Sequence, residues 1–121
     1  MGPVSGWTDD GVARSGTLPS DWYTSQELYE LEQRTLFREV WHCVGRSEQV
    51  AEAGQYITCT VANEQVVVAR GTDGVLRALS NVCLHRAGPV AMGCGQRKAF
   101  QCPYHGWTFE LDGRVRRTQG M

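Results

Sequence analysis

The sequence predicts a mostly β fold, an antiparallel β domain with two ligand-bearing loops that is preceded by one N-terminal helix. Three observations in the 121 residues predict it. Leucines recur at helical spacing in one stretch near the N-terminus. Beyond that stretch, Gly, Pro and Asp-Gly pairs divide the chain into short segments rich in β-branched and aromatic residues. Two of the intervening loops each carry one cysteine and one histidine.

The N-terminal part divides into an arm and a helical lead-in. Residues 1–16 are rich in Gly, Ser and Asp without any periodicity, so we expect a flexible arm there. Residues 17–44 form the lead-in. Within it, Thr24 and Glu27 have the T-x-x-E spacing of a capping box, which predicts a helix over about 25–38. The apolar positions of this helix are Leu28, Leu31, Leu36 and Val40.

Residues 45–121 are expected to form the β domain. The strand candidates in this part are 56–61, 65–70, 75–81, 99–102, 107–111 and 114–117. The run Val66-Val67-Val68 indicates that the second of these strands is buried on both faces. Asp73-Gly74 and Asp112-Gly113 are two-residue hairpin signals that connect neighbouring strands. The loops with Cys and His then lie at strand ends.

Composition and charge exclude several classes of protein. The chain has 12 Lys and Arg residues against 13 Asp and Glu residues, so it lacks the basic excess of a nucleic-acid-binding protein. It has no apolar run long enough to span a membrane and no secretory signal pattern at its N-terminus. Five cysteines without such a signal argue against a disulfide scaffold. We therefore expect a cytoplasmic protein whose cysteines are buried, metal-bound or reactive.

The two loops have the donor atoms of a metal site. The first reads Cys83-Leu84-His85 and the second reads Cys102-Pro103-Tyr104-His105. Two thiolates and two imidazoles can bind Zn²⁺ or an iron–sulfur cluster. A zinc finger usually takes like ligands from each half, whereas each loop here supplies one ligand of each type. This arrangement suits two metal positions, with both thiolates on one iron and both imidazoles on the other.

Two other interpretations of the four residues stay open at this point. One is a structural Cys₂His₂ zinc module. The other is a Cys–His hydrolase, which needs one cysteine and one histidine and leaves the second pair unexplained. Neutral imidazoles in place of two thiolates make an iron–sulfur cluster easier to reduce, which is why such clusters have potentials of roughly −150 to +300 mV. The mixed pairing of ligands favours the cluster.

The sequence around these residues resembles the motif of Rieske [2Fe–2S] proteins, and more narrowly that of the α-subunits of Rieske-type non-heme iron (ring-hydroxylating) oxygenases. The likeness runs over about 18–117 and is carried mainly by 83–89 and 102–107. Respiratory Rieske proteins are similar but have an additional cysteine beside each ligand pair, where this chain has Leu84 and Tyr104. The other similar segments are Trp22-Tyr23, 36–41, Val44-Gly45 and 79–83.

The resemblance implies a cofactor and a set of residues around it. The residues that would bind the [2Fe–2S] cluster are Cys83, His85, Cys102 and His105. The residues that would surround it are Arg86, Tyr104 and Trp107. Because Trp107 stands where the high-potential respiratory proteins have a serine, we expect a potential at the low end of the Rieske range. Cys94 is expected to be a spare thiol, and Cys43 and Cys59 are expected in the core.

The resemblance also implies partners for electron transfer. A reductase or ferredoxin would supply the electrons, with NAD(P)H as their indirect source, and the full-length protein would be a homo-oligomer, a trimer. Family members oxygenate their substrates at a mononuclear Fe(II) that two histidines and one carboxylate hold in a C-terminal domain. Outside the two loops this chain has only His42, so we expect the electron-transfer domain alone, with no catalytic residue. The parent enzyme would be an oxidoreductase, either a Rieske monooxygenase or a Rieske dioxygenase.

Further expectations depend on the missing catalytic domain. We expect an N-terminal part of an oxygenase subunit, and a free-standing Rieske ferredoxin acting as an electron carrier is the alternative. Because family members supply a further strand beyond this point, we expect strand 65–70 to lack a partner on one side and the chain to self-associate. The lead-in and 85–89 resemble members that act on aromatic acids or quaternary amines. Aromatic hydrocarbon catabolism is therefore one expected role.

Overall fold

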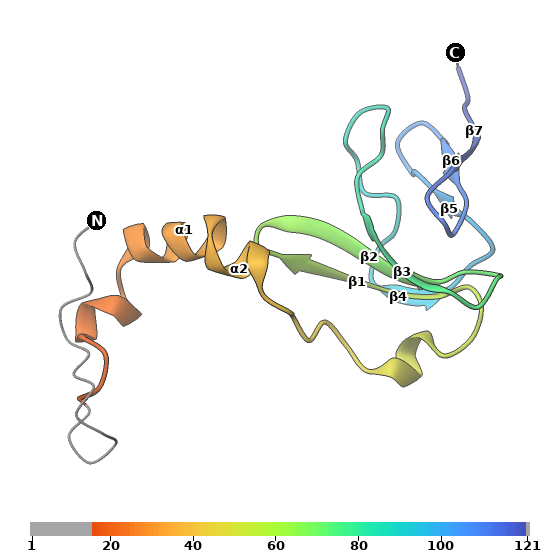
Figure 1. The fold of residues 1–121 in the computed structure, drawn as a ribbon. Helices are drawn as coiled ribbons and strands as arrows, with labels where there is room; N and C mark the ends of the chain where they lie inside the picture. The colour runs from red at the N-terminus through yellow and green to blue at the C-terminus, as the bar shows by residue number, and fades with distance from the viewer. Residues whose placement is uncertain (1–15, 121) are drawn as a thin grey trace. The chain divides into compact units, whose positions relative to one another are not determined.

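The computed structural model describes residues 16–120 of the chain (Figure 1). It divides into two compact units, of which the first ends at Glu39 and the second begins at Val40. The expected flexible arm at 1–16 lies outside the described residues, except for Gly16. Among the residues that are described, no helix has the length and apolar character needed to cross a membrane.

The first unit is helical. Its elements are the 3₁₀ turn η1 (Ser20–Tyr23) and the helices α1 (Gln26–Arg34) and α2 (Leu36–Glu39). The hydroxyl of Ser25 caps α1 by accepting a hydrogen bond from the N–H of Leu28 at 3.1 Å. The predicted capping box of Thr24 and Glu27 is wrong by one residue, because Thr24 instead ends η1. A serine cap needs no glutamate partner to satisfy one of the free N–H groups at a helix start.

Thr35 separates the two helices inside the stretch that was predicted as one. Its N–H and its hydroxyl both donate to the carbonyl of Leu31, at 3.0 and 2.8 Å. A β-branched residue whose hydroxyl bonds to the carbonyl one turn earlier bends a helix. The prediction of a helical segment over about 25–38 is therefore confirmed, with an interruption that the leucine spacing does not reveal.

The second unit is built on a four-stranded antiparallel sheet, which we call sheet A. After the 3₁₀ turn η2 (Ser47–Val50), its strands are β1 (Gln55–Val61), β2 (Glu64–Arg70), β3 (Leu76–Ser80) and β4 (Cys94–Gln96). They lie in the order β3-β2-β1-β4. The first three fall where the sequence predicts strands. β4 escapes prediction because it has only three residues, all exposed, and none is β-branched or aromatic.

A two-residue turn that the sequence does not signal joins β1 to β2. Val61 and Glu64 face each other across it, and the turn residues Ala62 and Asn63 both have positive φ, 47° and 65°. Two consecutive positive φ values are the type I′ pattern, whose twist matches that of the strands. Asn adopts this conformation readily, whereas an alanine in it is unfavourable.

The connection from β2 to β3 is longer than the two-residue hairpin that Asp73-Gly74 predicts. Residues 71–75 form it, and only Gly74 has positive φ, 77°. The carboxylate of Asp73 accepts a hydrogen bond from the N–H of Val75 at 3.0 Å. A side chain that bonds the backbone two residues further on stabilises a turn by itself, so the turn position is confirmed and its length is not.

The valine-rich strand β2 lies inside sheet A, between β1 and β3. Val67 and Ala69 belong to the larger buried cluster, whereas Val68 belongs to a smaller one formed by a different set of side chains. The predicted burial of both faces is therefore confirmed. The prediction that strand 65–70 lacks a partner on one side is wrong, because β1 and β3 pair with its two edges. The run is apolar because neighbouring parts of the protein cover it. Within residues 16–120, the edge strands of sheet A are β3 and β4.

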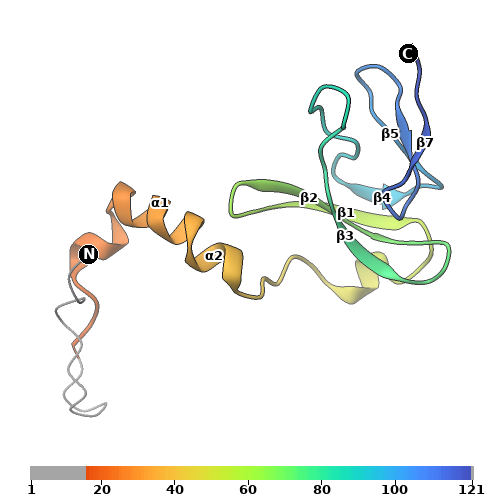
Figure 2. The ribbon, with the colours of Figure 1, turned by 45° about the horizontal axis from the view of Figure 1, so that its top comes forward.

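A smaller sheet of three strands, sheet B, holds the second predicted loop. Its strands β5 (Phe100–Gln101), β6 (Thr108–Phe109) and β7 (Val115–Arg117) lie in the order β5-β6-β7. Asp112-Gly113 lies at the predicted turn position, but the connection runs over residues 110–114 and is longer than the predicted two residues. In it Gly113 has a φ of 89°, and the Asp112 carboxylate accepts from the N–H of Arg114 at 3.1 Å. Figures 1 and 2 show sheet B beside the long segment that joins β3 to β4.

The larger core cluster holds the two sheets together. Tyr56 of β1 and Phe100 of β5 meet edge to face, with ring centroids 5.3 Å apart, and both side chains are buried. Burying one such ring stabilises a fold by roughly 1.5–3 kcal/mol. Cys83 and Cys102 belong to the same cluster. The cysteines of both loops are thus fixed by the contact between the sheets.

Cys43 and Cys59, which were both expected in the core, are less buried than predicted. Cys43 is exposed, because the described segment 40–46 forms no strand and Trp41 beside it is fully exposed as well. The prediction that Cys43 lies in the core is therefore wrong. Cys59 is partly buried in β1, where burial raises the pKa of its thiol.

Candidate metal centre

The loop between β3 and β4, which we call loop 1 (residues 82–90), begins with a buried cysteine. The N–H of Cys83 donates to the carbonyl of Gly88 at 2.7 Å, and the N–H of Ala87 donates to the carbonyl of Cys83 at 2.9 Å. Ala87 has a positive φ of 56°. These two bonds close a short ring of backbone in which His85 occupies the middle.

The loop between β5 and β6, loop 2 (residues 102–107), repeats this geometry. The N–H of Cys102 donates to the carbonyl of Trp107 at 2.8 Å, and the N–H of Gly106 donates to the carbonyl of Cys102 at 2.9 Å. Gly106 has a positive φ of 78°, like Ala87 at the same distance from its cysteine. The two loops therefore share one backbone conformation, although their histidines follow the cysteines at different spacings.

Asn81 anchors loop 1 to the protein, a role that the sequence analysis misses. Its side chain is buried and donates to the carbonyl of Ala91 at 2.8 Å. Its oxygen accepts from the N–H groups of Val90 and Ala91, at 3.0 and 2.9 Å. Because this one amide bonds to the far end of the loop, it brings both ends together. No pattern in the sequence signals this role, because the bonds of Asn81 to Val90 and Ala91 form only in the folded loop.

The two histidine rings lie side by side. Their centroids are 4.7 Å apart, and the rings meet edge to face at 73°. Trp107 stacks on His85 at 5.0 Å with an interplanar angle of 9°, and Tyr104 lies 4.0 Å from His105. The cysteines are only 3% and 2% exposed, whereas His85 is partly exposed and His105 is exposed. The site thus has an inner pair of thiols and an outer pair of imidazoles.

The two loops also lie close together, with Gly88 of loop 1 near a cysteine side chain of loop 2. A Cβ atom placed on Gly88 of loop 1 would lie 3.7 Å from the Sγ atom of Cys102 in loop 2. Within residues 16–120, no group of three or more His, Cys, Asp or Glu side chains is arranged to hold one metal ion. A Rieske cluster asks for two protein ligands on each of its two irons.

The donor chemistry of the site fits a [2Fe–2S] cluster. Soft thiolates in an apolar core and imidazoles near the surface are the two ligand types of Rieske centres. The indole Nε1 of Trp107 is buried beside His85 and has no hydrogen-bond partner in the protein. Buried N–H groups are normally paired, so this donor is suited to an acceptor supplied by a bound group.

The remaining predicted residues lie at the rim. Arg86 is exposed in loop 1, and its exposed neighbour Leu84 and the exposed Tyr104 of loop 2 flank the histidines. Leu84 and Tyr104 occupy the positions at which respiratory Rieske proteins are expected to have cysteines. Cys94 lies on β4, paired with Ile57 of β1, and is exposed.

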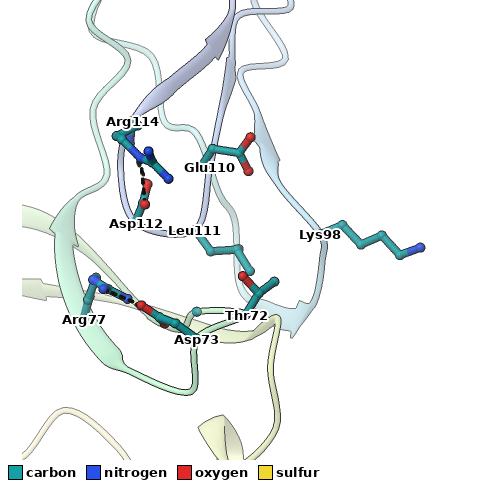
Figure 3. A pocket seen from close by; sticks show the side chains of 9 residues that line it. Thr72, Asp73, Arg77, Lys98, Glu110, Leu111, Asp112 and Arg114 are labelled. Carbon is teal, nitrogen blue, oxygen red and sulfur yellow. Dashed lines mark hydrogen bonds and ion pairs between the residues drawn. The ribbon is translucent and has the colours of Figure 1, made fainter.

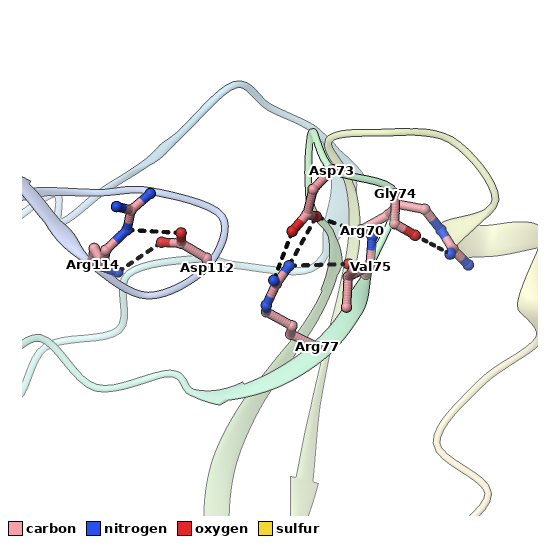
Figure 4. Close-up of polar contacts among 7 residues, drawn as sticks. All are labelled: Arg70, Asp73, Gly74, Val75, Arg77, Asp112 and Arg114. Carbon is pink, nitrogen blue, oxygen red and sulfur yellow. Dashed lines mark hydrogen bonds and ion pairs between the residues drawn. The ribbon is translucent and has the colours of Figure 1, made fainter.

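A polar pocket of about 160 Å³ lies between the β2–β3 connection and the β6–β7 turn (Figure 3). Arg77 forms an ion pair with Asp73 at 2.7 Å, and Arg114 forms one with Asp112 at 2.8 Å (Figure 4). The hydrogen bond from Arg77 holds the pKa of Asp73 well below its usual value. The hydrogen bond from the Arg114 N–H lowers the pKa of Asp112. These carboxylates are paired charges and contribute no ligand to the metal centre.

Comparison with known proteins agrees with this geometry. Residues 40–121 match the model of the Rieske [2Fe-2S] domain. The chain is 45% identical over 100 residues to the carnitine monooxygenase oxygenase subunit of Acinetobacter baumannii, covering 82% of this chain and 27% of that protein. It is 44% identical over 99 residues to the chloroplastic choline monooxygenase of Beta vulgaris, covering 82% of this chain and 22% of that protein.

Solved structures show the same relationship. A quaternary ammonium Rieske monooxygenase, described for carnitine oxidation and inter-subunit electron transfer, superposes with a TM-score of 0.85 at 37% identity. The match covers 97% of this chain and 33% of that one. Naphthalene 1,2-dioxygenase superposes with a TM-score of 0.72 at 33% identity, covering 78% and 21% of the two chains.

These matches place the chain within much longer proteins. It spans about a quarter of the length of the curated relatives it matches. The resemblance to respiratory Rieske proteins is the weaker one in the sequence, and the relatives named here are oxygenase subunits. The two equivalent loops and the matched region both lie in the second unit. Loop geometry and sequence identity thus lead to one conclusion: the chain belongs to the Rieske [2Fe-2S] domain family, in the form that oxygenase α-subunits carry.

Proposed function

We propose that Cys83, His85, Cys102 and His105 bind a [2Fe–2S] cluster and that the chain transfers single electrons through it. The observation that carries this proposal is the shared backbone geometry of loops 1 and 2, each of which combines a buried cysteine with a more exposed histidine. The two thiolates would hold the inner iron and the two imidazoles the outer one. The bound cluster supplies a one-electron redox centre.

The protein residues determine where electrons enter and leave. The core encloses both thiols, so it separates the inner side of the site from an electron-transfer partner. His85 and His105 have their rings 4.7 Å apart toward the surface, which makes the imidazole side the shorter route to a partner. Leu84 and Tyr104 form an exposed apolar rim around them, suited to contact with an electron-transfer partner.

The wider role follows from the relatives. We propose that a reductase or ferredoxin, supplied from NAD(P)H, gives electrons to this domain. The acceptor would be a mononuclear iron oxygenase site in a catalytic domain such as the relatives' longer chains provide, within a homo-oligomer such as a trimer. Carnitine and choline monooxygenases reach 45% and 44% identity, whereas naphthalene dioxygenase reaches 33%. A quaternary amine is therefore the better substrate proposal, and aromatic hydrocarbon catabolism is not supported.

The alternatives considered for the sequence are less well supported. A free-standing ferredoxin is not favoured, since the proteins that match 82% of the chain are oxygenase subunits. A zinc module does not require the stacked Trp107 with its buried N–H. A hydrolase would use only one of two equivalent loops.

Metal analysis tests the proposal directly. The chain purified without oxygen should contain about two irons and two sulfides and no stoichiometric zinc. After reduction it should give the electron paramagnetic resonance signal of a one-electron-reduced [2Fe–2S] cluster. A colourless protein with one zinc per chain would overturn the proposal, and it would support the structural zinc module instead.

A further inference from the structure

The structure assigns a specific role to Trp107: we propose that its indole N–H donates a hydrogen bond to a sulfur atom of the cluster and raises the reduction potential. The inference rests on the proposed function, because it requires a cluster at loops 1 and 2. It goes beyond that function by naming a side chain, not itself a ligand, that sets how readily the centre accepts an electron.

The first observation is a buried donor without a partner. Trp107 is 8% exposed, and its Nε1 atom is shielded from solvent without a hydrogen bond to any protein atom. Leaving a buried N–H unsatisfied costs about 1–3 kcal/mol. Among the described residues the one other such side-chain atom is Oε1 of Gln33, an acceptor in the helical unit. Trp107 is thus the single orphaned donor next to the metal centre.

The second observation is the orientation of the indole. Its plane is within 9° of the plane of the His85 ring, with the centroids 5.0 Å apart. An N–H bond lies in the plane of its ring, so it cannot point at the face of a ring stacked parallel to it. The acceptor must therefore lie at the edge of the stack and cannot be the imidazole itself.

The third observation concerns the atoms available at that edge. Among the hydrophobic side chains of the buried cluster that contains Trp107, the groups with acceptor atoms are the hydroxyl of Tyr56 and the two thiols. The Tyr56 hydroxyl donates to the carbonyl of Met92 at 3.1 Å, and it does not accept from Trp107, because Nε1 has no partner in the protein. The N–H of Cys102 donates to the carbonyl of Trp107, which ties this tryptophan to one ligand through the backbone. No protein atom accepts from the indole, so its acceptor is supplied by the group bound at the two loops, and the acceptor atoms of an iron–sulfur cluster are its sulfurs.

The consequence for the potential follows from charge. Reduction adds one negative charge to the cluster, and a donor to sulfur stabilises the reduced form more than the oxidised form. Loss of the donor therefore lowers the potential. Hydrogen bonds to charged groups are strong enough to change an equilibrium by about tenfold or more, and tenfold corresponds to about 59 mV for one electron.

The test uses Trp107→Phe, which keeps an aromatic ring for the stack on His85 and removes the N–H. Its potential should fall by about 59 mV relative to the unaltered chain, the equivalent of a tenfold shift of the reduction equilibrium. Trp41→Phe is the matched control, because it makes the same substitution at a tryptophan outside both loops whose side chain is fully exposed. That control should leave the potential unchanged.

A second measurement needs no variant and distinguishes a hydrogen bond from packing. The chain is prepared with tryptophan labelled with ¹⁵N at the indole, and pulsed electron paramagnetic resonance is recorded on the reduced cluster in H₂O and in D₂O. A hydrogen bond predicts a ¹⁵N coupling and one exchangeable proton that disappear in Trp107→Phe. Trp107→Leu removes the stack as well, so it reports the contribution of packing.

The outcomes separate the two proposals. If the unaltered chain holds no cluster, the proposed function fails. If the cluster is present but Trp107→Phe keeps the original potential while Trp107→Leu lowers it, the ring acts by stacking and the hydrogen bond is refuted. If Trp107→Phe fails to assemble a cluster, the ¹⁵N coupling in the unaltered chain decides, and its absence refutes the inference.

Discussion

His85 and His105 show how the chain obtains equivalent ligands from unequal spacings. One residue separates Cys83 from His85, and two residues separate Cys102 from His105. The backbone bonds nevertheless close both loops at the same distance from each cysteine. The difference in spacing moves only the histidine within its loop, which leaves His85 partly buried under Trp107 and His105 exposed. The two imidazoles are therefore not interchangeable.

Replacing the exposed imidazole by a thiolate tests the ligand assignment. His105→Cys should lower the reduction potential if a cluster still assembles, because a thiolate adds negative charge to it. The expected shift is on the order of 100 mV, about half the difference between all-cysteine plant-type clusters and the lowest Rieske potentials. Protein-film voltammetry measures it.

Cys94→Ser is the control for that variant. Cys94 lies on β4 and is exposed, whereas the two proposed thiolate ligands are buried. Its replacement should change neither the potential nor the visible spectrum. If Cys94→Ser lost the cluster, the proposed ligand set would be wrong.

Other residues of the site were less accessible to sequence reasoning. Paired Cys and His residues have a recognisable chemistry, so the four proposed ligands could be named from their spacing and resemblance. Asn81 has no such signature, because its value depends on bonds to Val90 and Ala91 that only the folded loop creates. Trp107 was expected near the cluster, but its orphaned N–H becomes visible only when the neighbours of the ring are known.

At the scale of elements, strand prediction succeeded where β-branched or apolar residues are concentrated, and it failed where a segment is a strand only because a neighbouring strand pairs with it. β1, β2 and β3 have β-branched or apolar runs that form strands in most contexts. β4 is exposed and glycine-containing, and it is a strand only because β1 offers hydrogen bonds to it. The apolar segment 40–46 has strand-like residues but no strand neighbour among the described residues, so it stays irregular. Local propensity does not contain this information.

The turn between β1 and β2 gives a prediction about stability. Ala62 has a φ of 47°, a conformation that costs a residue with a Cβ about 1–2 kcal/mol. Ala62→Gly removes this conformational cost in the folded chain. The greater freedom of glycine in the unfolded chain offsets part of the gain in stability. We expect Ala62→Gly to stabilise the domain by about 0.5–1 kcal/mol, measured by chemical denaturation with the cluster oxidised.

The same substitution in a strand should have the opposite sign. Ala78 lies in β3, where it pairs with Val68 in an extended conformation that does not require glycine. Ala78→Gly should destabilise the domain by about 0.5–1 kcal/mol. Equal effects of the two variants would show that the positive φ of Ala62 carries no strain.

The core and the rim of the second unit both bring its two sheets into relation. The larger core cluster joins sheet A to sheet B and holds both cysteines. At the rim, Arg77 of β3 pairs with Asp73. The hydrogen bond with Asp73 raises the pKa of Arg77, and the charge of Asp112, which lies before β7, raises it further. Arg77 thus links the two hairpin turns electrostatically.

The link makes a prediction about acid. The hydrogen bond from Arg77 lowers the pKa of Asp73 in the folded chain, and the N–H of Arg114 lowers that of Asp112. A carboxylate whose pKa is lower when folded stabilises the fold at pH values above its unfolded pKa of about 3.9, and this contribution is lost as the pH falls further. Asp73→Asn should therefore be less stable than the unaltered chain at neutral pH, and the gap should begin to narrow below about pH 4 and shrink further as the pH falls toward the lowered pKa of the folded chain.

The measurement is the denaturation midpoint of both proteins at each pH from neutral to about pH 3. Any effect of acid on the cluster is shared by the two proteins, so it cancels in the difference between their midpoints. Asp73 is exposed, so the gap should also shrink in high salt, which screens exposed charges. A gap for Asp73→Asn that stays constant with pH and salt would mean that the lost side chain acts through its shape. The ion pair between Asp73 and Arg77 would then make no measurable electrostatic contribution to stability.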